Sequence, residues 1–179
     1  MVLPTDTVYG LCGDPRSEAA AREIYRLKRR PAEQPLALLA ADAEALLELV
    51  PELPRALLPG PYTVVLPNPA ERFGWLTGSS PATIGVRIPE LPDATAKVLA
   101  QVGPVVATSA NLHGGRETRT LEDLPPEIRA GAGALVDGGE LPGTPSTVLD
   151  LTRAEPRVLR EGAVPAGQAL EAARAAFGR

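Results

Sequence analysis

The chain has 179 residues, of which 44% are hydrophobic and 22% are charged, so it can bury one substantial core and is expected to form a single domain over residues 1–179. Its formal net charge of -4 argues against broad, sequence-independent binding to a nucleic-acid backbone, which needs a basic surface. No stretch approaches the roughly 20 apolar residues that span a bilayer. The first residues also lack the charged and apolar regions of a secretory signal, so a cytoplasmic protein is expected.

Hydrophobic spacing and the placement of Gly and Pro predict an alternation of helices and strands. The expected elements, in chain order, are a helix over 17–29, a strand over 35–40, a helix over 43–50 with a further helical turn after Pro51, strands over 61–67 and 82–89, a helix over 93–102, a strand over 105–110, the start of a helix over 120–128, strands over 133–138, 146–152 and 156–161, and a helix over 165–178. This order predicts an α/β fold with a twisted, mixed sheet and flanking helices.

Polar residues gather at five places, mostly where predicted strands and helices end, and strand ends are where open α/β sheets place ligand sites. These places are 5–10, 28–31, 83–87, 108–111 and 146–147, the last followed by Arg160. Arginine binds a carboxylate or phosphate with two donors, lysine offers a point charge, and Ser, Thr and Asn are short donors. The set suits a ligand that carries a polyphosphate and a carboxylate. Catalysis would then work through positioning and charge neutralisation rather than through a side-chain nucleophile.

Each place also has a purely structural explanation, which the sequence leaves open. Residues 5–7 could form only a turn with Asx-type hydrogen bonds, and the cations at 28–30 are favoured at a helix C-terminus by the helix dipole. Residues 109–111 could be a turn at the end of a strand. Arg87 is harder to explain in this way, because it lies in an apolar strand and must either face solvent or meet an anion.

Several familiar catalytic and binding arrangements are absent from the sequence. Cys12 is the only cysteine and His113 the only histidine, which excludes an internal disulfide and a Cys/His zinc cluster. We expect Cys12 in the core, His113 in a loop, and Asp150 at the end of a strand rather than in the role of a base. Neither a P-loop nor a G-x-G-x-x-G motif occurs, so any nucleotide must be held by other means.

Eight segments, taken together and in this order, resemble the YrdC/TsaC family of threonylcarbamoyl-AMP synthases. They are PTDTVYGL, LKRRPAEQPLALL, LPGPYTVVLP, GWLTG, IGVRIPE, VVATSANLHG, STVLDL and VLREG, which extend from Pro4 to about Gly162. The resemblance implies a twisted α/β fold with a deep, positively lined central cavity. It also implies that threonine, bicarbonate or CO2, and ATP react to give threonylcarbamoyl-AMP and pyrophosphate, for the modification of tRNA to N6-threonylcarbamoyladenosine.

The resemblance assigns roles to residues at matching positions of this sequence. Threonine would be contacted by Thr7, Arg87, Thr108, Ser109 and Ser146. ATP would be contacted by Lys28, Arg30, Gln34, Thr83, Asn111, Arg119 and Arg160. Those closest to the reaction would be Lys28, Arg30, Ser109 and Asn111. Mg²⁺ is expected as the counter-ion of ATP, held mainly by the nucleotide rather than by a protein metal site.

The resemblance also sets expectations for partners and for departures from the family. A separate complex would transfer the threonylcarbamoyl group to tRNA, and the chain looks like the short, single-domain type. Only Met1-Val2-Leu3 precede the PTDT segment, where the family usually has a helix and a full strand, and leucines stand at 39 and 91, where many relatives have histidine. Two alternatives are a divergent paralogue that acts on another nucleotide or carbamoyl substrate and a non-catalytic module for double-stranded RNA, which the acidic net charge disfavours.

Overall fold

The computed structural model describes residues 1–50 and 57–176, and these form eight strands and five helices. In chain order the elements are β1 (Val2–Pro4), β2 (Tyr9–Gly13), α1 (Glu18–Lys28), β3 (Ala37–Leu39), α2 (Ala43–Leu47), β4 (Tyr62–Pro67), β5 (Thr83–Arg87), α3 (Asp93–Val102), β6 (Val105–Ser109), α4 (Pro126–Gly131), β7 (Thr147–Asp150), β8 (Arg157–Arg160) and α5 (Ala166–Ala176). In this part of the chain no helix is long and apolar enough to cross a membrane.

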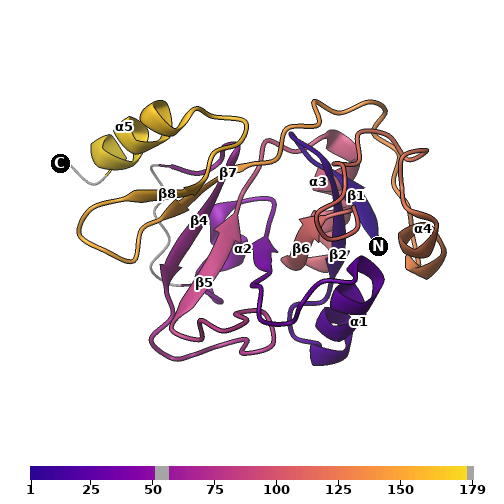
Figure 1. The fold of residues 1–179 in the computed structure, drawn as a ribbon, viewed down its shortest axis with the longest axis horizontal. Helices are drawn as coiled ribbons and strands as arrows, with labels where there is room; N and C mark the ends of the chain where they lie inside the picture. Colours follow the sequence, from indigo (N-terminus) through magenta and orange to yellow (C-terminus); the bar gives the residue numbers. More distant parts are fainter. Residues whose placement is uncertain (51–56, 177–179) are drawn as a thin grey trace.

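The described strands form one mixed sheet in the order β1-β2-β6-β3-β5-β4-β7-β8. The pairs β3·β5 and β4·β7 are parallel, whereas the other neighbouring strands are antiparallel. Figure 1 shows β1, β2 and β6 on one side of the molecule with α1, α3 and α4, and β4, β5, β7 and β8 on the other side with α5. The predicted α/β fold with a mixed sheet and flanking helices is therefore confirmed.

The two faces of the central strands differ in character because successive residues of a strand point to opposite faces. One face is built from branched apolar side chains, and one residue of each of five strands is fully buried there: Leu38, Val64, Val86, Val106 and Leu149 are all 0% exposed. α1 packs on β2 and α4, and α5 packs on β7 and β8. The positions in between are smaller or polar, and this face carries the cavity described below.

Local signals explain most of the helices. Ser17 caps α1 by accepting a hydrogen bond from the amide of Ala20 at 3.2 Å, as its position predicted, and Asp42 caps α2 through the amide of Ala45 at 2.8 Å. α2 is shorter than expected, because its last helical residue is Leu47. The further helical turn predicted after Pro51 lies outside the described residues, as does the end of the helix expected over 165–178.

Two strands that were not expected, one expected strand and the start of one helix differ from the sequence prediction. β1 and β2 flank the polar turn at 5–8. They were not expected, because β1 is only three residues long and β2 contains two glycines. They are strands because they pair with each other and β2 pairs with β6. Residues 133–138 form only an isolated bridge between Leu135 and Val2, and α4 begins at Pro126 rather than near 120.

Candidate functional site

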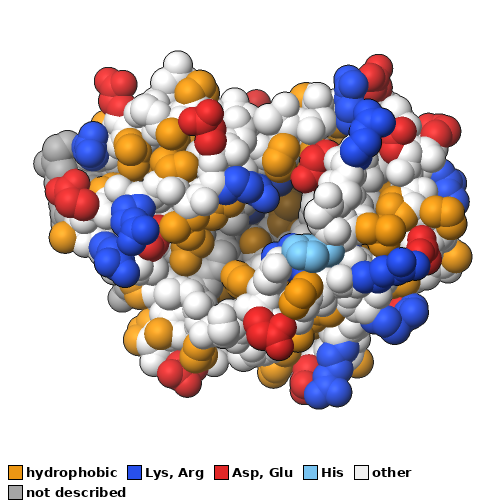
Figure 2. Space-filling model, in the orientation of Figure 1, with side chains coloured by type: hydrophobic (Ala, Val, Ile, Leu, Met, Phe, Trp, Pro, Cys, Tyr) orange, Lys and Arg blue, Asp and Glu red, His pale blue; other side chains and the backbone are white. Residues whose placement is uncertain are grey.

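A cavity of about 270 Å³ opens on the face of the sheet with small side chains. Its size lies near the lower end of the roughly 300–1,000 Å³ typical of small-molecule sites. The residues that line it are Thr5, Val8, Gly10, Arg30, Pro35, Leu36, Ala37, Leu39, Thr63, Val65, Thr83, Gly85, Arg87, Ala107, Thr108, Ser109, Pro145, Ser146, Val148 and Arg160. Figure 2 shows the molecule hollowed near its centre, with basic side chains beside the hollow. Seven strands, β2 to β8, thus contribute to one concave, cationic site.

The alternation of the strands explains why these residues meet. On β5, Thr83, Gly85 and Arg87 face the cavity, while Ile84 and Val86 face the core. Gly85 lines the cavity without a side chain, and a Cβ there would lie in van der Waals contact with the Cβ of Ala37, at 3.4 Å. Small residues such as Gly85, Ala37 and Ala107 therefore leave space for the cavity. The polar residues next to them line it.

Arg87 ends β5 and is held by the polar turn between β1 and β2. Its Nη2 atom donates to Asp6 Oδ1 and to Thr7 Oγ1, the latter at 2.6 Å. The side chains of Arg87 and Asp6 are only 11% and 13% exposed. Of the two options that the sequence left for Arg87, the structure shows the second, because the arginine meets an anion that belongs to the chain itself.

Arg30 reaches the cavity because of the way α1 ends. Arg29 has a left-handed φ of 52°, and the amide of Arg30 donates to Tyr25 O at 3.0 Å, so the chain turns back sharply after the helix. Arg30 Nη2 donates to Pro35 O at 3.0 Å. A left-handed conformation at a residue other than glycine is uncommon, and here it places a cation at the cavity.

The segment 74–78, the GWLTG motif, supports the loop that carries Arg30. The amide of Leu36 donates to Leu76 O at 2.8 Å, and the amide of Ser79 donates to Glu33 O at 2.9 Å. Gly78 has a φ of +59°, and a Cβ at this position would lie 2.2 Å from Glu33 O. Only glycine therefore allows this close approach between the two loops.

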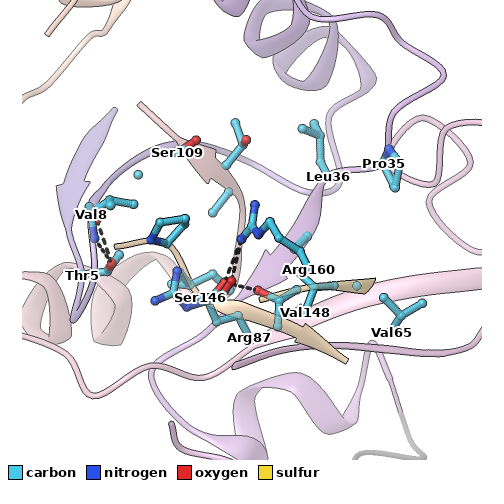
Figure 3. Close-up of a pocket in the computed structure, with 18 of the residues that line it drawn as sticks. Thr5, Val8, Pro35, Leu36, Val65, Arg87, Ser109, Ser146, Val148 and Arg160 are labelled. Atoms are coloured by element: carbon cyan, nitrogen blue, oxygen red, sulfur yellow. Dashed lines mark hydrogen bonds between the residues drawn. The ribbon is translucent and has the colours of Figure 1, made fainter. Parts of the chain in front are cut away.

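Arg160 belongs to a polar network on the other half of the sheet. Its Nη2 donates to Ser146 O at 2.7 Å, and the hydroxyl groups of Ser146 and Thr63 are 2.8 Å apart (Figure 3). Ser146 immediately precedes β7, and Thr63 faces the cavity from the neighbouring β4. Thr63 was not singled out from the sequence, although the alternation of the strand over 61–67 would have put it on the same face as Val65.

Lys28 lies behind the cavity wall rather than in it. It is 1% exposed, and its Nζ donates to Asn111 O at 2.6 Å, to Asn111 Oδ1 at 2.9 Å, and to Ser109 O. Ser109 Oγ in turn donates to Asn111 Oδ1 at 2.6 Å. The lysine at the end of α1 thus shapes the turn that follows β6, and it adds positive charge close to the hydroxyl of Ser109.

The basic side chains of the site have lowered pKa values, because they are buried and because their positive charges repel one another. Burial, with Arg30 as the next cause, lowers the pKa of Lys28 to about 8. Burial lowers the pKa of Arg30 and that of Arg160, and Arg160 contributes to the shift of Arg30. The pKa of Arg87 is also lowered by burial, although Asp6 opposes the shift. An anionic ligand would stabilise these positive charges, so the site is suited to bind one.

The structure brings most of the predicted site residues to one place. Those that line the cavity are Arg30, Thr83, Arg87, Thr108, Ser109, Ser146 and Arg160. Three others contact the lining from behind: Thr7 through Arg87, and Lys28 and Asn111 through Ser109. Gln34 and Arg119 do not line the cavity. Gln34 Nε2 lies 3.3 Å from His113 Nε2 instead, and Arg119 pairs with Glu140 at 2.7 Å.

Residues expected to have no catalytic part lie where the sequence placed them. Cys12 is 3% exposed, and burial raises the pKa of its thiol to about 12, as suits a core residue. His113 is an exposed loop residue, and Asp150 is the last residue of β7. Thr5, which lines the cavity, and Asp6, which pairs with Arg87, belong to the PTDT motif, but neither was assigned a role in the site from the sequence.

Comparison with known proteins identifies the family. The Sua5/yciO/yrdC family, described as telomere recombination, matches residues 1–162. The chain belongs to this family. The resemblance noted in the sequence is thereby confirmed, and it covers all five polar segments that meet at the cavity.

Relatives of this Sua5/yciO/yrdC chain include threonylcarbamoyl-AMP synthases. That of Escherichia coli is 37% identical over 178 residues, which covers 90% of this chain and 88% of the relative. That of Pyrococcus abyssi is 34% identical over 173 residues, or 92% of this chain, and the chain spans about half, 51%, of that relative's length. The crystal structure of P. abyssi Sua5 complexed with L-threonine matches 99% of this chain and 53% of the other, with a TM-score of 0.80 and 31% identity.

Proposed function

We propose that this chain is an enzyme that forms threonylcarbamoyl-AMP and pyrophosphate from L-threonine, bicarbonate or CO2, and ATP. The observation that carries the proposal is that Arg30, Arg87 and Arg160 line one cavity together with several hydroxyl groups. A substrate pair with one carboxylate and a triphosphate supplies the negative charge that this set requires. Homology to threonylcarbamoyl-AMP synthases over about nine-tenths of the chain supports the same reaction.

The geometry supports a division of the cavity between the two substrates. Arg87 would bind the carboxylate of threonine, because among these three arginines it is the one that is buried. Arg30 and Arg160 would bind the phosphates of ATP. Ser109 and Ser146 would contact the substrates, since both line the cavity together with these cations.

The reaction needs positioning more than it needs a reactive side chain. The amine of threonine would capture CO2 to give N-carboxy-threonine, whose new carboxylate would attack the α-phosphorus of ATP and expel pyrophosphate. Arg30 and Arg160, supported by the charge of Lys28, would stabilise the negative charge that builds up on the phosphates. The product would serve the modification of tRNA, through a separate complex that transfers the threonylcarbamoyl group.

Mg²⁺ would enter as the counter-ion of ATP. In the described ranges, 1–50 and 57–176, no group of three or more His, Cys, Asp and Glu residues could hold a metal ion. The ion would therefore be held mainly by phosphate oxygens and water, which is the usual coordination of nucleotide-bound magnesium. Its contribution would be to neutralise part of the phosphate charge, next to the arginines that neutralise the rest.

Pyrophosphate release tests the proposal directly. The purified chain with ATP, L-threonine, bicarbonate and Mg²⁺ should release pyrophosphate and form an adenylate of the expected mass. An Arg22→Ala variant should behave as the wild type, because Arg22 lies on α1 with 77% of its side chain exposed and pairs only with Glu18 among the described residues. Pyrophosphate release at the same rate without threonine would contradict the proposed function.

A further inference from the structure

The turn that holds Arg87 is itself fixed by several hydrogen bonds. Thr5 Oγ1 accepts from the amides of Thr7 and Val8, both at 3.3 Å, and donates to Val8 O at 2.7 Å. The hydroxyl groups of Thr5 and Thr7 lie 3.2 Å apart. Thr5 and Thr7 are 3% and 2% exposed, so the turn is a buried and ordered support.

The guanidinium group of Arg87 lies between this turn and the cavity. Arg87 lines the cavity, whereas Asp6 and Thr7 do not. Both bonds from the turn go to one nitrogen, Nη2, so Asp6 and Thr7 hold a single corner of the group. The Nη1 atom makes no hydrogen bond with the described residues and, unlike Nε, is not buried. Arginine has five N–H donors in a rigid plane, so donors remain for a second anion while the pair with Asp6 persists.

Asp6 itself has an unusual environment for a carboxylate. Its Oδ2 atom is buried and makes no hydrogen bond with the part of the chain that is described. Burial raises the pKa of Asp6, and the charge and hydrogen bond of Arg87 oppose this shift. A buried carboxylate of this kind is retained at a cost to stability, and a role in the site would account for it.

We propose that Asp6 is a positioning residue, which holds the guanidinium plane of Arg87 in the orientation that accepts the carboxylate of the amino-acid substrate. This inference rests on the proposed function and extends it to a residue that touches neither substrate. The ion pair fixes a long, flexible side chain before the substrate arrives, so less conformational freedom is lost on binding. Asp6 would stay paired with Arg87 when the substrate binds.

Threonine binding by charge variants of Asp6 tests this role. We expect Asp6→Asn to weaken L-threonine binding by about tenfold, measured by calorimetry, because the amide cannot hold the guanidinium by charge. In the pyrophosphate assay the KM for threonine should rise while kcat and the KM for ATP stay nearly unchanged. Asp14→Asn is the matched control, since Asp14 is exposed and its side chain accepts a hydrogen bond from the amide of Arg16 alone among the described residues. Equal or tighter threonine binding by Asp6→Asn would overturn the inference.

A double-mutant cycle separates positioning from a general effect on the fold. If Asp6 acts through Arg87, then adding Asp6→Asn to Arg87→Ala should not weaken threonine binding further. Additive losses would show that Asp6 acts by another route and would overturn the inference. Thermal unfolding checks that each variant is folded. If Asp6→Asn does not fold, Asp6→Glu replaces it, and it should weaken threonine binding but not ATP binding because the longer side chain shifts the guanidinium.

The same titrations distinguish a failure of the positioning role from a failure of the proposed function on which it rests. If the wild type binds no threonine, the proposed function fails, and the positioning role fails with it. If the wild type binds threonine and Asp6→Asn binds it equally well, only the positioning role fails.

Discussion

The arginines of the cavity handle positive charge in two opposite ways, and we call the place of Arg87 the paired end and that of Arg30 and Arg160 the unpaired end. At the end beside the β1–β2 turn, Arg87 forms a buried ion pair with Asp6. At the other end, Arg30 and Arg160 donate to the backbone carbonyls of Pro35 and Ser146, and neither forms an ion pair with a carboxylate of the described residues. One end is neutralised by the chain itself, and the other leaves its charge for a ligand.

This difference matches the proposed substrates. A single carboxylate carries one charge and needs an accurately oriented partner, which a rigid ion pair provides. A triphosphate carries several charges and many acceptor oxygens, so it can satisfy cations that have no other anion nearby. The paired end should therefore decide orientation and specificity, and the unpaired end should decide affinity and its dependence on salt.

The largest expected effect comes from removing the paired arginine. Arg87→Ala leaves Asp6 buried without its partner, which should lower the free energy of unfolding by about 3–5 kcal/mol. Threonine affinity should fall by about a hundredfold or more, and ATP affinity much less. Chemical denaturation and calorimetry with each substrate measure both effects. Equal losses of threonine and ATP affinity would contradict the division of the cavity between the two ends.

A smaller effect, with the opposite selectivity, is expected at the unpaired end. Arg160→Ala should weaken ATP binding by about 1.5–3 kcal/mol, the usual value of a hydrogen bond to a charged group. It should lower the free energy of unfolding much less than Arg87→Ala does, because the group left behind is the neutral carbonyl of Ser146 and not a buried charge. Titration with ATP at two salt concentrations should also show a weaker salt dependence than in the wild type. A loss of stability as large as that of Arg87→Ala would remove the distinction between the ends.

The smallest effect on substrate binding is expected in the loop that carries Arg30. Gly78→Ala places a Cβ against Glu33 O in a left-handed conformation, and we expect a loss of about 1–3 kcal/mol in stability with a moderate rise in the KM for ATP. Gly74→Ala in the same segment is the control, because a Cβ at Gly74 meets no atom within 4 Å. Thermal unfolding and the pyrophosphate assay compare the two. Similar behaviour of both variants would show that the close approach at Gly78 does not position Arg30.

Much of the fold follows from short-range patterns that a reader of the sequence can see. α1 begins after Ser17 because a serine there can cap the first turn. The strands β4 and β5 are β-branched runs bounded by Gly and Pro, and their alternation predicts which residues share a face. By contrast, β1 and β2 carry little local signal, and pairing with distant residues such as Thr108 makes them strands.

The sequence alone showed that Lys28, Arg30 and Arg87 lie in polar segments and that Arg160 follows another. The family resemblance then indicated that these segments bind threonine and ATP. Only the tertiary structure decided which of these residues line the cavity, because that depends on the order and register of strands far apart in the chain. It also decided that Arg87 has a carboxylate partner. Asp6 lies 81 residues away from Arg87 in the chain, and no local pattern can reveal a contact that sheet packing alone brings about.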